Sequence, residues 1–195
     1  VCWSPELRLF VAVSTTGTGN RVMTSSDGIT WTIRTSAADN QWLSVCWAPE
    51  INLFVAVSNT GTGNRVMTSP DGINWTARSA AGNDDTWWGI TYGNGLFVAV
   101  SSSNGTIAAT SSNGITWTQR TLPTSTQWYS VIYGNGKYIA VGLNNAATSL
   151  DGVTWTLQTI ASGSWGALCF GGGLFISADI SGTNSSAASS MDGIT

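Results

Sequence analysis

The residues best suited to chemistry lie in a short stretch that recurs along the chain. "SSDGITWT" (25–32) combines a carboxylate with hydroxyl side chains and an indole, and a carboxylate in such a setting could act as a general base. The third copy, "SSNGITWT" (111–118), has an amide at the carboxylate position, and an amide cannot serve as that base. We therefore predict a structural hairpin turn in every copy, because Asp and Asn accept hydrogen bonds from their own loop and the following Gly adopts positive φ. The turn positions are Asp27, Asp71, Asn113, Asp151 and Asp192.

Other groups that could catalyse a reaction are few. The sequence has no histidine, and its only glutamates, Glu6 and Glu50, stand in "PE" turns at equivalent places of the repeat. Arg34, Arg78 and Arg120 also recur in register, as structural side chains would. We predict no catalytic residues, no cofactor and no metal site, and we expect that the protein is not an enzyme.

The three cysteines share one position of the repeat. The equivalent position is occupied by Thr91 and Ile132 in the copies that lack Cys2, Cys46 and Cys169. Exchange with Thr and Ile indicates a small side chain that fills space in the core. We expect free thiols rather than a disulfide. A zinc site is not expected, because the chain has neither histidine nor a CxxC pair.

Composition excludes two classes of partner. Only 9% of the 195 residues are charged and the net charge is −3, so the chain lacks the basic patch that nucleic acid requires. No apolar run approaches the ~20 residues of a membrane span, and no membrane insertion is expected. A surface built from Ser, Thr, Asn and Gly favours an extracellular or particle-surface location.

The chain is built from an internal repeat of about 40 residues. The glycines that follow the turn Asp or Asn recur at Gly28, Gly72, Gly114, Gly152 and Gly193. The repeat divides the chain into units at about 1–44, 45–89, 90–130, 131–167 and 168–195, which we take as one domain.

Each unit has the pattern of four short strands. Ser44 to Glu50 predicts a first strand, the apolar run "LFVAV" at 53–57 a second, Asn20 to Ser25 a third and Thr30 to Thr35 a fourth. An apolar second strand indicates a sheet covered on both faces. Four antiparallel strands per unit, without helical periodicity, predict an all-β fold: a β-propeller with five visible blades, the last incomplete.

The repeated S-x-D-G-x-T-W, preceded by "YGNGLFVAV" (92–100), resembles the Asp-box (BNR-type) β-propeller repeats found in sialidases, sortilin-type receptors and photosystem assembly factors. The resemblance covers essentially the whole chain, although the common Asp box has one more residue between Asp and Gly. It implies that the hairpin is structural and lies on the face away from a ligand.

A sialidase-like glycosidase is the enzyme that this resemblance suggests. Such an enzyme needs an arginine cluster, a tyrosine activated by a glutamate, and an acid for proton transfer. The chain has two glutamates and lacks the Arg-Ile-Pro segment of the sialidases, so we regard this activity as the least favoured.

Our preferred hypothesis is recognition of a carbohydrate, or of a protein surface, at the rim where the first strands begin. Aromatic residues gather there beside loops rich in Gly, Asn and Thr, and sugar rings need aromatic planes beside polar groups. The alternative is that the tryptophans in strict register pack on neighbouring blades. The candidates are Trp42, Trp87, Trp88, Trp128, Tyr129 and Trp165.

A third hypothesis is a structural or assembly subunit of a fibre, tail or surface layer. The fifth unit stops at Thr195, before the Trp and the fourth strand that the pattern requires. We expect an unpaired edge in the last blade, and either a longer parent chain or a strand donated by a neighbouring chain.

Overall fold

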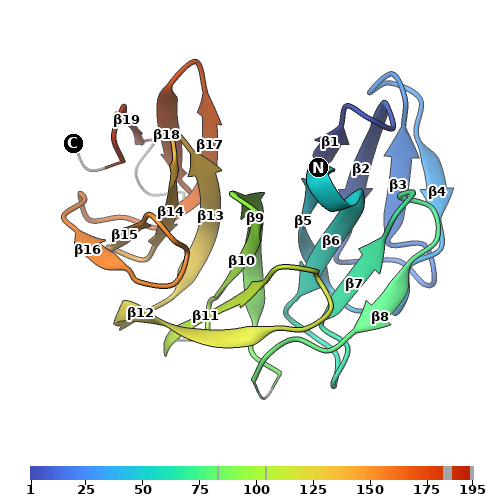
Figure 1. Ribbon diagram of the computed structural model, residues 1–195, viewed down its shortest axis with the longest axis horizontal. Helices are drawn as coiled ribbons and strands as arrows, with labels where there is room; N and C mark the ends of the chain where they lie inside the picture. Colours follow the sequence, from blue (N-terminus) through green and yellow to red (C-terminus); the bar gives the residue numbers. More distant parts are fainter. Residues whose placement is uncertain (83, 104, 182–185, 194–195) are drawn as a thin grey trace.

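The computed structural model describes residues 1–82, 84–103, 105–181 and 186–193 (Figure 1). Within these ranges it contains 19 strands, arranged in five antiparallel sheets, and one 3₁₀ turn, η1 (Pro49–Ile51). The sheets follow one another along the chain, and we number them as blades 1 to 5. Blade 1 comprises β1 (Cys2–Ser4), β2 (Leu9–Val13), β3 (Val22–Ser25) and β4 (Thr32–Arg34); blade 2 comprises β5 (Trp42–Ala48), β6 (Leu53–Ser58), β7 (Val66–Ser69) and β8 (Thr76–Arg78). Blade 3 comprises β9 (Trp87–Gly93), β10 (Leu96–Ser101), β11 (Gly105–Ser111) and β12 (Thr118–Thr126); blade 4 comprises β13 (Trp128–Gly134), β14 (Lys137–Gly142), β15 (Ala146–Ser149) and β16 (Thr156–Gln158); blade 5 comprises β17 (Trp165–Gly171), β18 (Leu174–Asp179) and β19 (Ala187–Ser190).

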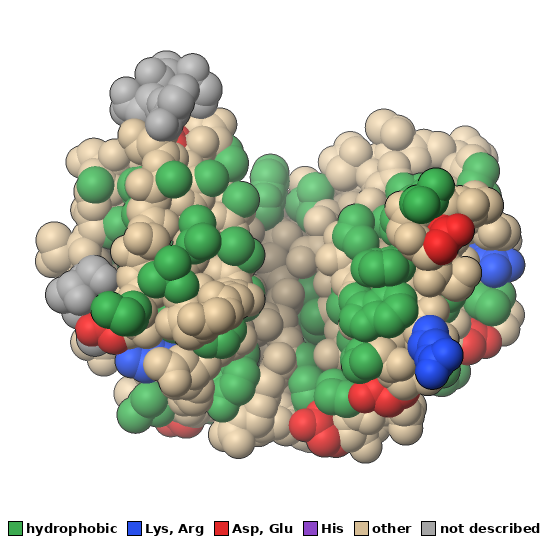
Figure 2. All heavy atoms as spheres, turned by 90° about the horizontal axis from the view of Figure 1, so that it is seen from above, with side chains coloured by type: hydrophobic (Ala, Val, Ile, Leu, Met, Phe, Trp, Pro, Cys, Tyr) green, Lys and Arg blue, Asp and Glu red, His purple; other side chains and the backbone are tan. Residues whose placement is uncertain are grey.

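The blades stand around a common axis as a five-bladed β-propeller, which confirms the predicted fold. The first strands β1, β5, β9, β13 and β17 contact one another in that order. Blade 5 has three strands in the described part of the chain, so the expectation of an incomplete last blade is also met. Blades 1 and 5 stand on opposite sides of a deep hollow that is open to one side (Figures 1 and 2).

The boundaries of the strands differ slightly from those predicted. The first strand of blade 2 begins at Trp42 rather than Ser44, and the third strand of blade 1 begins at Val22 rather than Asn20. In blades 2 to 5, the tryptophan that precedes the predicted first strand therefore belongs to the sheet and not to the loop.

The second strands form the core, as their apolar sequence predicts. Phe54, Val55, Ala56 and Val57 are completely buried, because one side of each sheet packs on the preceding blade and the other side on the following blade. A tight turn joins the first and second strands. In blade 3 it places Asn94 and Gly95 at φ of 47° and 75°, a conformation that Asn and Gly adopt more readily than other residues.

Each DG hairpin is held by bonds within its own turn. Asp27 Oδ1 accepts hydrogen bonds from the backbone N–H groups of Ile29 (2.8 Å) and Thr30 (2.7 Å), and Ser25 Oγ accepts one from Gly28 N–H (2.9 Å). Asn113 accepts the same two backbone bonds through its amide oxygen at 2.9 Å. An amide therefore replaces the carboxylate without loss of the turn.

Because successive strands alternate in direction, the connections fall on two faces. The first-to-second and third-to-fourth connections, with the DG hairpins, form what we call the hairpin face. The second-to-third connections (such as 14–21 and 59–65) and the links between blades (such as 35–41) form the loop face.

The cysteines show what a missing neighbour does to one position of the repeat. All three are free, and Cys46 is buried as a filler should be, but Cys169 is exposed. The prediction of a buried residue is wrong for Cys169, because no blade packs against its side of blade 5 among the described residues. Among the described residues, no helix has the length and apolar character needed to cross a membrane.

Candidate ligand-binding face

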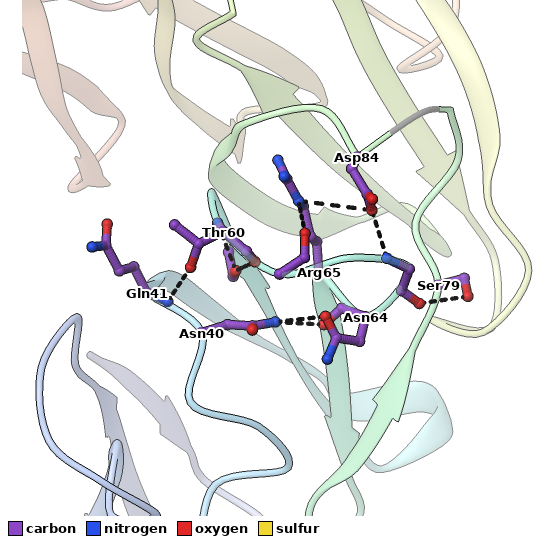
Figure 3. A network of polar contacts seen from close by, with 10 residues as sticks. Asn40, Gln41, Thr60, Asn64, Arg65, Ser79 and Asp84 are labelled. Carbon is purple, nitrogen blue, oxygen red and sulfur yellow. Dashed lines mark hydrogen bonds and ion pairs between the residues drawn. The ribbon is translucent and has the colours of Figure 1, made fainter.

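The loop face is a set of interlocked loops (Figure 3). Asn40, in the link between blades 1 and 2, donates hydrogen bonds to the backbone oxygen (2.8 Å) and the side-chain oxygen (3.1 Å) of Asn64. The next backbone N–H, that of Gln41, is bonded to Thr60 Oγ1 at 2.8 Å. Gly61 has φ of 104°, and a Cβ at this position would stand 2.4 Å from the Asn40 amide, so the loop needs glycine here.

An arginine and an aspartate clamp each of the first two second-to-third loops. Arg65 Nε donates to the Gly61 carbonyl (2.8 Å) and lies 3.7 Å from Asp84 Oδ1, which accepts the N–H of Gly63 (2.8 Å; Figure 3). Arg21 and Asp39 repeat this arrangement in blade 1, with Nε and Oδ1 separated by 3.8 Å. The carboxylates of Asp39 and Asp84 therefore hold the backbone N–H groups of these loops in place. Among the described residues no three His, Cys, Asp or Glu side chains gather as metal ligands.

A β-bulge at the start of the first strand displaces one residue from the regular ladder in each of blades 2 to 5. The register shifts between Trp87 and Gly89 in blade 3 and between Trp128 and Ser130 in blade 4, which leaves Trp88 and Tyr129 as the extra residues. Bulges bend a strand and turn a side chain away from the regular ladder, and they are frequent beside functional sites. The equivalent bulged residues in blades 2 and 5 are Leu43 and Gly166.

Trp88 and Tyr129 meet edge to face, and we call them the aromatic pair. Their ring centroids are 5.7 Å apart with an interplanar angle of 63°, and both side chains are partly exposed. The Tyr129 hydroxyl donates to Gln127 Oε1. Burial raises the pKa of Tyr129, so the phenol stays protonated at neutral pH. Together with the Gln127 amide, the aromatic pair therefore offers ring surface and a hydroxyl at the loop-face ends of β9 and β13.

The other four rim candidates are corrected by the structure. Trp42, Trp87, Trp128 and Trp165 are at most 2% exposed, so they have no surface to offer a ligand. Three of their indole N–H groups donate to backbone oxygens four residues earlier in the chain, at Ala38 (3.0 Å), Thr124 (3.4 Å) and Ala161 (2.8 Å). These tryptophans pack between blades, as the alternative hypothesis held. Their strict register was the sequence signal for packing.

The glutamates connect neighbouring blades. Glu6 of blade 1 accepts a hydrogen bond from Trp47 Nε1 of blade 2 at 2.7 Å. Glu50 of blade 2 makes the corresponding contact with Tyr92 of blade 3. Burial, and after it the hydrogen bond with Glu50, raises the pKa of Tyr92 to about 12. The sequence shows that both glutamates occupy equivalent turns, but it does not identify these partners.

The arginines in register bind within their own blades. Arg34 and Arg120 donate through Nε to Thr24 Oγ1 and Thr110 Oγ1, both at 2.9 Å, and thereby join the fourth strand to the third. Gln158 makes the corresponding bond to Thr148 in blade 4 at 2.9 Å. The three arginines do not form a cluster that could bind a substrate carboxylate.

Comparison with known proteins identifies the fold. No protein-family model and no curated protein matches the chain. Among solved structures, a virginiamycin B lyase from Staphylococcus aureus aligns with a TM-score of 0.72 at 14% identity, over 90% of this chain and 64% of that one. A streptogramin B lyase aligns with a TM-score of 0.72 at 12% identity, over 88% and 62% of the two chains. YCF48 bound to a D1 peptide aligns with a TM-score of 0.55 at 16% identity, over 81% and 54%.

These likenesses show the propeller fold and correct one prediction. The chain spans less than two thirds of the length of each of the two lyases. Both lyases are enzymes, and this finding contradicts the prediction, drawn from the shortage of catalytic residue types, that this protein is not an enzyme. The likeness at 12–14% identity does not assign their reaction to this chain.

Proposed function

We propose that the protein is a recognition module that binds a carbohydrate at the aromatic pair on its loop face. The observation that carries this proposal is the β-bulge, which turns Trp88 and Tyr129 out of the core while Trp87 and Trp128 beside them stay buried. Sugar rings stack their C–H faces on aromatic planes and bond their hydroxyls to amides and phenols. The Tyr129 hydroxyl and Gln127 provide such polar groups.

The interlocked loops support this proposal, because a rigid site loses little conformational entropy when it binds. The low charge of the chain is also suited to a neutral ligand. We propose an extracellular or particle-surface location on compositional grounds, and an origin in the Asp-box family on the repeated motif and the hydrogen bonds of its turn.

The test is a glycan-array screen of the folded protein, repeated with Trp88→Ala and followed by titration of a positive glycan. Loss of the ring face should cost about 1 kcal/mol, or about fivefold in affinity. Trp3→Ala is a matched control, because Trp3 is 39% exposed on blade 1, away from the loop face. A blank array, or equal binding by Trp88→Ala, would contradict the proposal. Any glycan that binds should also be followed for chemical conversion.

A second candidate function is assembly. It is favoured by the two outer sides of the propeller, which are the side of blade 1 away from blade 2 and the side of blade 5 away from blade 4. Trp3 and Met23 of blade 1 are each 39% exposed, whereas the equivalent Trp47 and Met67 of blade 2 are 7% and 0% exposed. At the other end, Ile176 of blade 5 is 42% exposed and corresponds to the fully buried Val55. Between neighbouring blades of this chain, the surfaces equivalent to these two sides pack on each other. The exposed sides of blades 1 and 5 are therefore complementary to further blade-like units. Concentration-dependent association that Trp3→Ala abolishes and Trp88→Ala leaves intact would favour assembly over glycan recognition.

A further inference from the structure

A cavity of about 310 Å³ lies between blades 4 and 5. Its walls include Ile139, Val141 and Ala146 of blade 4 and Phe175, Ser177 and Ala188 of blade 5. An engineered apolar cavity of about 150 Å³ already binds benzene, so this space is large enough for an indole ring.

At the equivalent place in the other interfaces a tryptophan is present. Trp75, Trp117 and Trp155 each stand directly before a fourth strand and pack against the apolar face of the preceding blade. Each also lies over the aromatic residue of its own second strand, with centroid separations of 6.4 Å to Phe54, 6.2 Å to Phe97 and 6.5 Å to Tyr138. Phe175 is the equivalent aromatic residue of blade 5, and in the described part of the chain it has only the Phe170 ring as an aromatic partner.

The edge of blade 5 beside this cavity has the features that hold a fourth strand elsewhere. In the described residues no strand pairs with the outer edge of β19, whereas β15 of blade 4 pairs with β16 through Thr148 and Thr156. Ser189 takes the place of Thr148, whose hydroxyl accepts a bond from Gln158. An arriving strand with Arg or Gln at that register would find an acceptor at Ser189.

One polar group in the cavity points to an occupant. Ser177 is 5% exposed, and its hydroxyl has no hydrogen-bond partner among the described residues. The corresponding residue of every other blade is alanine: Ala12, Ala56, Ala99 and Ala140. A buried hydroxyl without a partner is costly, and an incoming polypeptide could supply the missing bond.

We propose that the edge of β19 and the adjoining cavity bind an extended peptide strand that carries Trp and, three residues later, Arg or Gln. The chain's own fourth strands have this spacing, at Trp31 and Arg34 in blade 1 and at Trp155 and Gln158 in blade 4. The strand adds to the sheet by β-augmentation, its indole fills the cavity over Phe175, and its Arg or Gln bonds to Ser189. This site is separate from the aromatic pair and does not depend on the glycan proposal.

The experiment titrates the 195-residue protein with a blocked, fluorescently labelled peptide that copies residues 152–159, "GVTWTLQT". We expect saturable binding that weakens at least tenfold when the peptide carries Trp155→Ala, and less when it carries Gln158→Ala. In the protein, Ala188→Trp should fill the cavity and weaken binding at least tenfold. Ala178→Trp is the matched control, because Ala178 is exposed on the opposite side of the same sheet and should leave binding unchanged.

Unfolding midpoints of both variants identify any loss of binding that comes from misfolding, and a second cavity-filling change, Ser177→Leu, replaces Ala188→Trp if that variant fails to fold. The proposal is overturned if the peptide does not bind, or if Trp155→Ala binds as well as the parent peptide. Free indole serves as a further probe. Binding of indole without binding of the peptide would identify a small-molecule cavity and would also overturn the strand proposal.

Discussion

The replacement Ser111→Ala tests directly whether the repeated DG motif is scaffold or site. Ser111 is 3% exposed, and its hydroxyl oxygen accepts hydrogen bonds from Gly114 N–H at 2.8 Å and from Asn113 N–H at 3.3 Å. The hydroxyl also donates to Asn113 Oδ1 at 3.1 Å. Alanine would remove all three bonds and leave the buried Gly114 N–H without a partner.

An unsatisfied buried donor costs about 1–3 kcal/mol, so we expect Ser111→Ala to lower the free energy of unfolding by about 2 kcal/mol. For a chain of this length that corresponds to a fall in Tm of about 4–8 °C. Urea unfolding followed by tryptophan fluorescence measures the change.

Ser112→Ala is the matched control, because Ser112 is the exposed neighbour in the same turn, and we expect a change within about 0.5 kcal/mol. A loss below about 0.5 kcal/mol in Ser111→Ala would refute the structural role of the turn. Lost glycan binding by a stable Ser111→Ala protein would place function in the hairpin and contradict the loop-face proposal.

Three further predictions concern protons, thiols and the contact between blades. Backbone N–H groups of Thr154 and Val153 lower the pKa of Asp151 from 3.8 to about 2; the stabilisation from its ionised form is therefore complete above pH 4 and lost as pH falls towards 2. In Asp151→Asn, the urea unfolding midpoint should change less with pH over this range, and an unchanged slope would contradict the stabilising role of the ionised Asp151. Exposed Cys169 should react with a thiol reagent at least 100-fold faster than Cys46, whose burial raises its pKa well above the usual value, and similar rates would contradict the burial of Cys46. Glu6→Gln should cost about 1 kcal/mol through the weakened bond to Trp47, whereas Glu6→Ala should cost more because the indole N–H loses its acceptor; equal unfolding midpoints would refute this contact.

Local chemistry explains why the hairpins could be predicted from the sequence. The bonds from Asp27 reach only two and three residues along the chain, so residue type and spacing were sufficient to identify the turn. The repeat then predicted the blades, because apolar runs such as 53–57 must be covered on both faces and the unit that recurs at about 40 residues supplies the cover. Neither inference required knowledge of a distant contact.

The candidate site could be predicted only in part. Trp87 and Trp88 are adjacent and identical in type, yet one is fully buried and the other is partly exposed. The difference comes from the β-bulge, which a one-residue shift between β9 and β10 creates. Such a shift depends on how two strands pair, and residue type alone does not specify it.

The sequence by itself determined the repeat, the turn chemistry and the propeller architecture, because these rest on local bonds and on a regular apolar pattern. Tertiary structure decided which copies of equivalent residues are exposed: Cys46 and Cys169 share one position of the repeat, but only Cys46 has a neighbouring blade on its side. It also decided the partners of Glu6, the position of the aromatic pair and the cavity beside β19, since each is created where two segments meet. The physical reason is that a side chain is buried only where a second surface packs against its own, and the repeat specifies only one of these two surfaces.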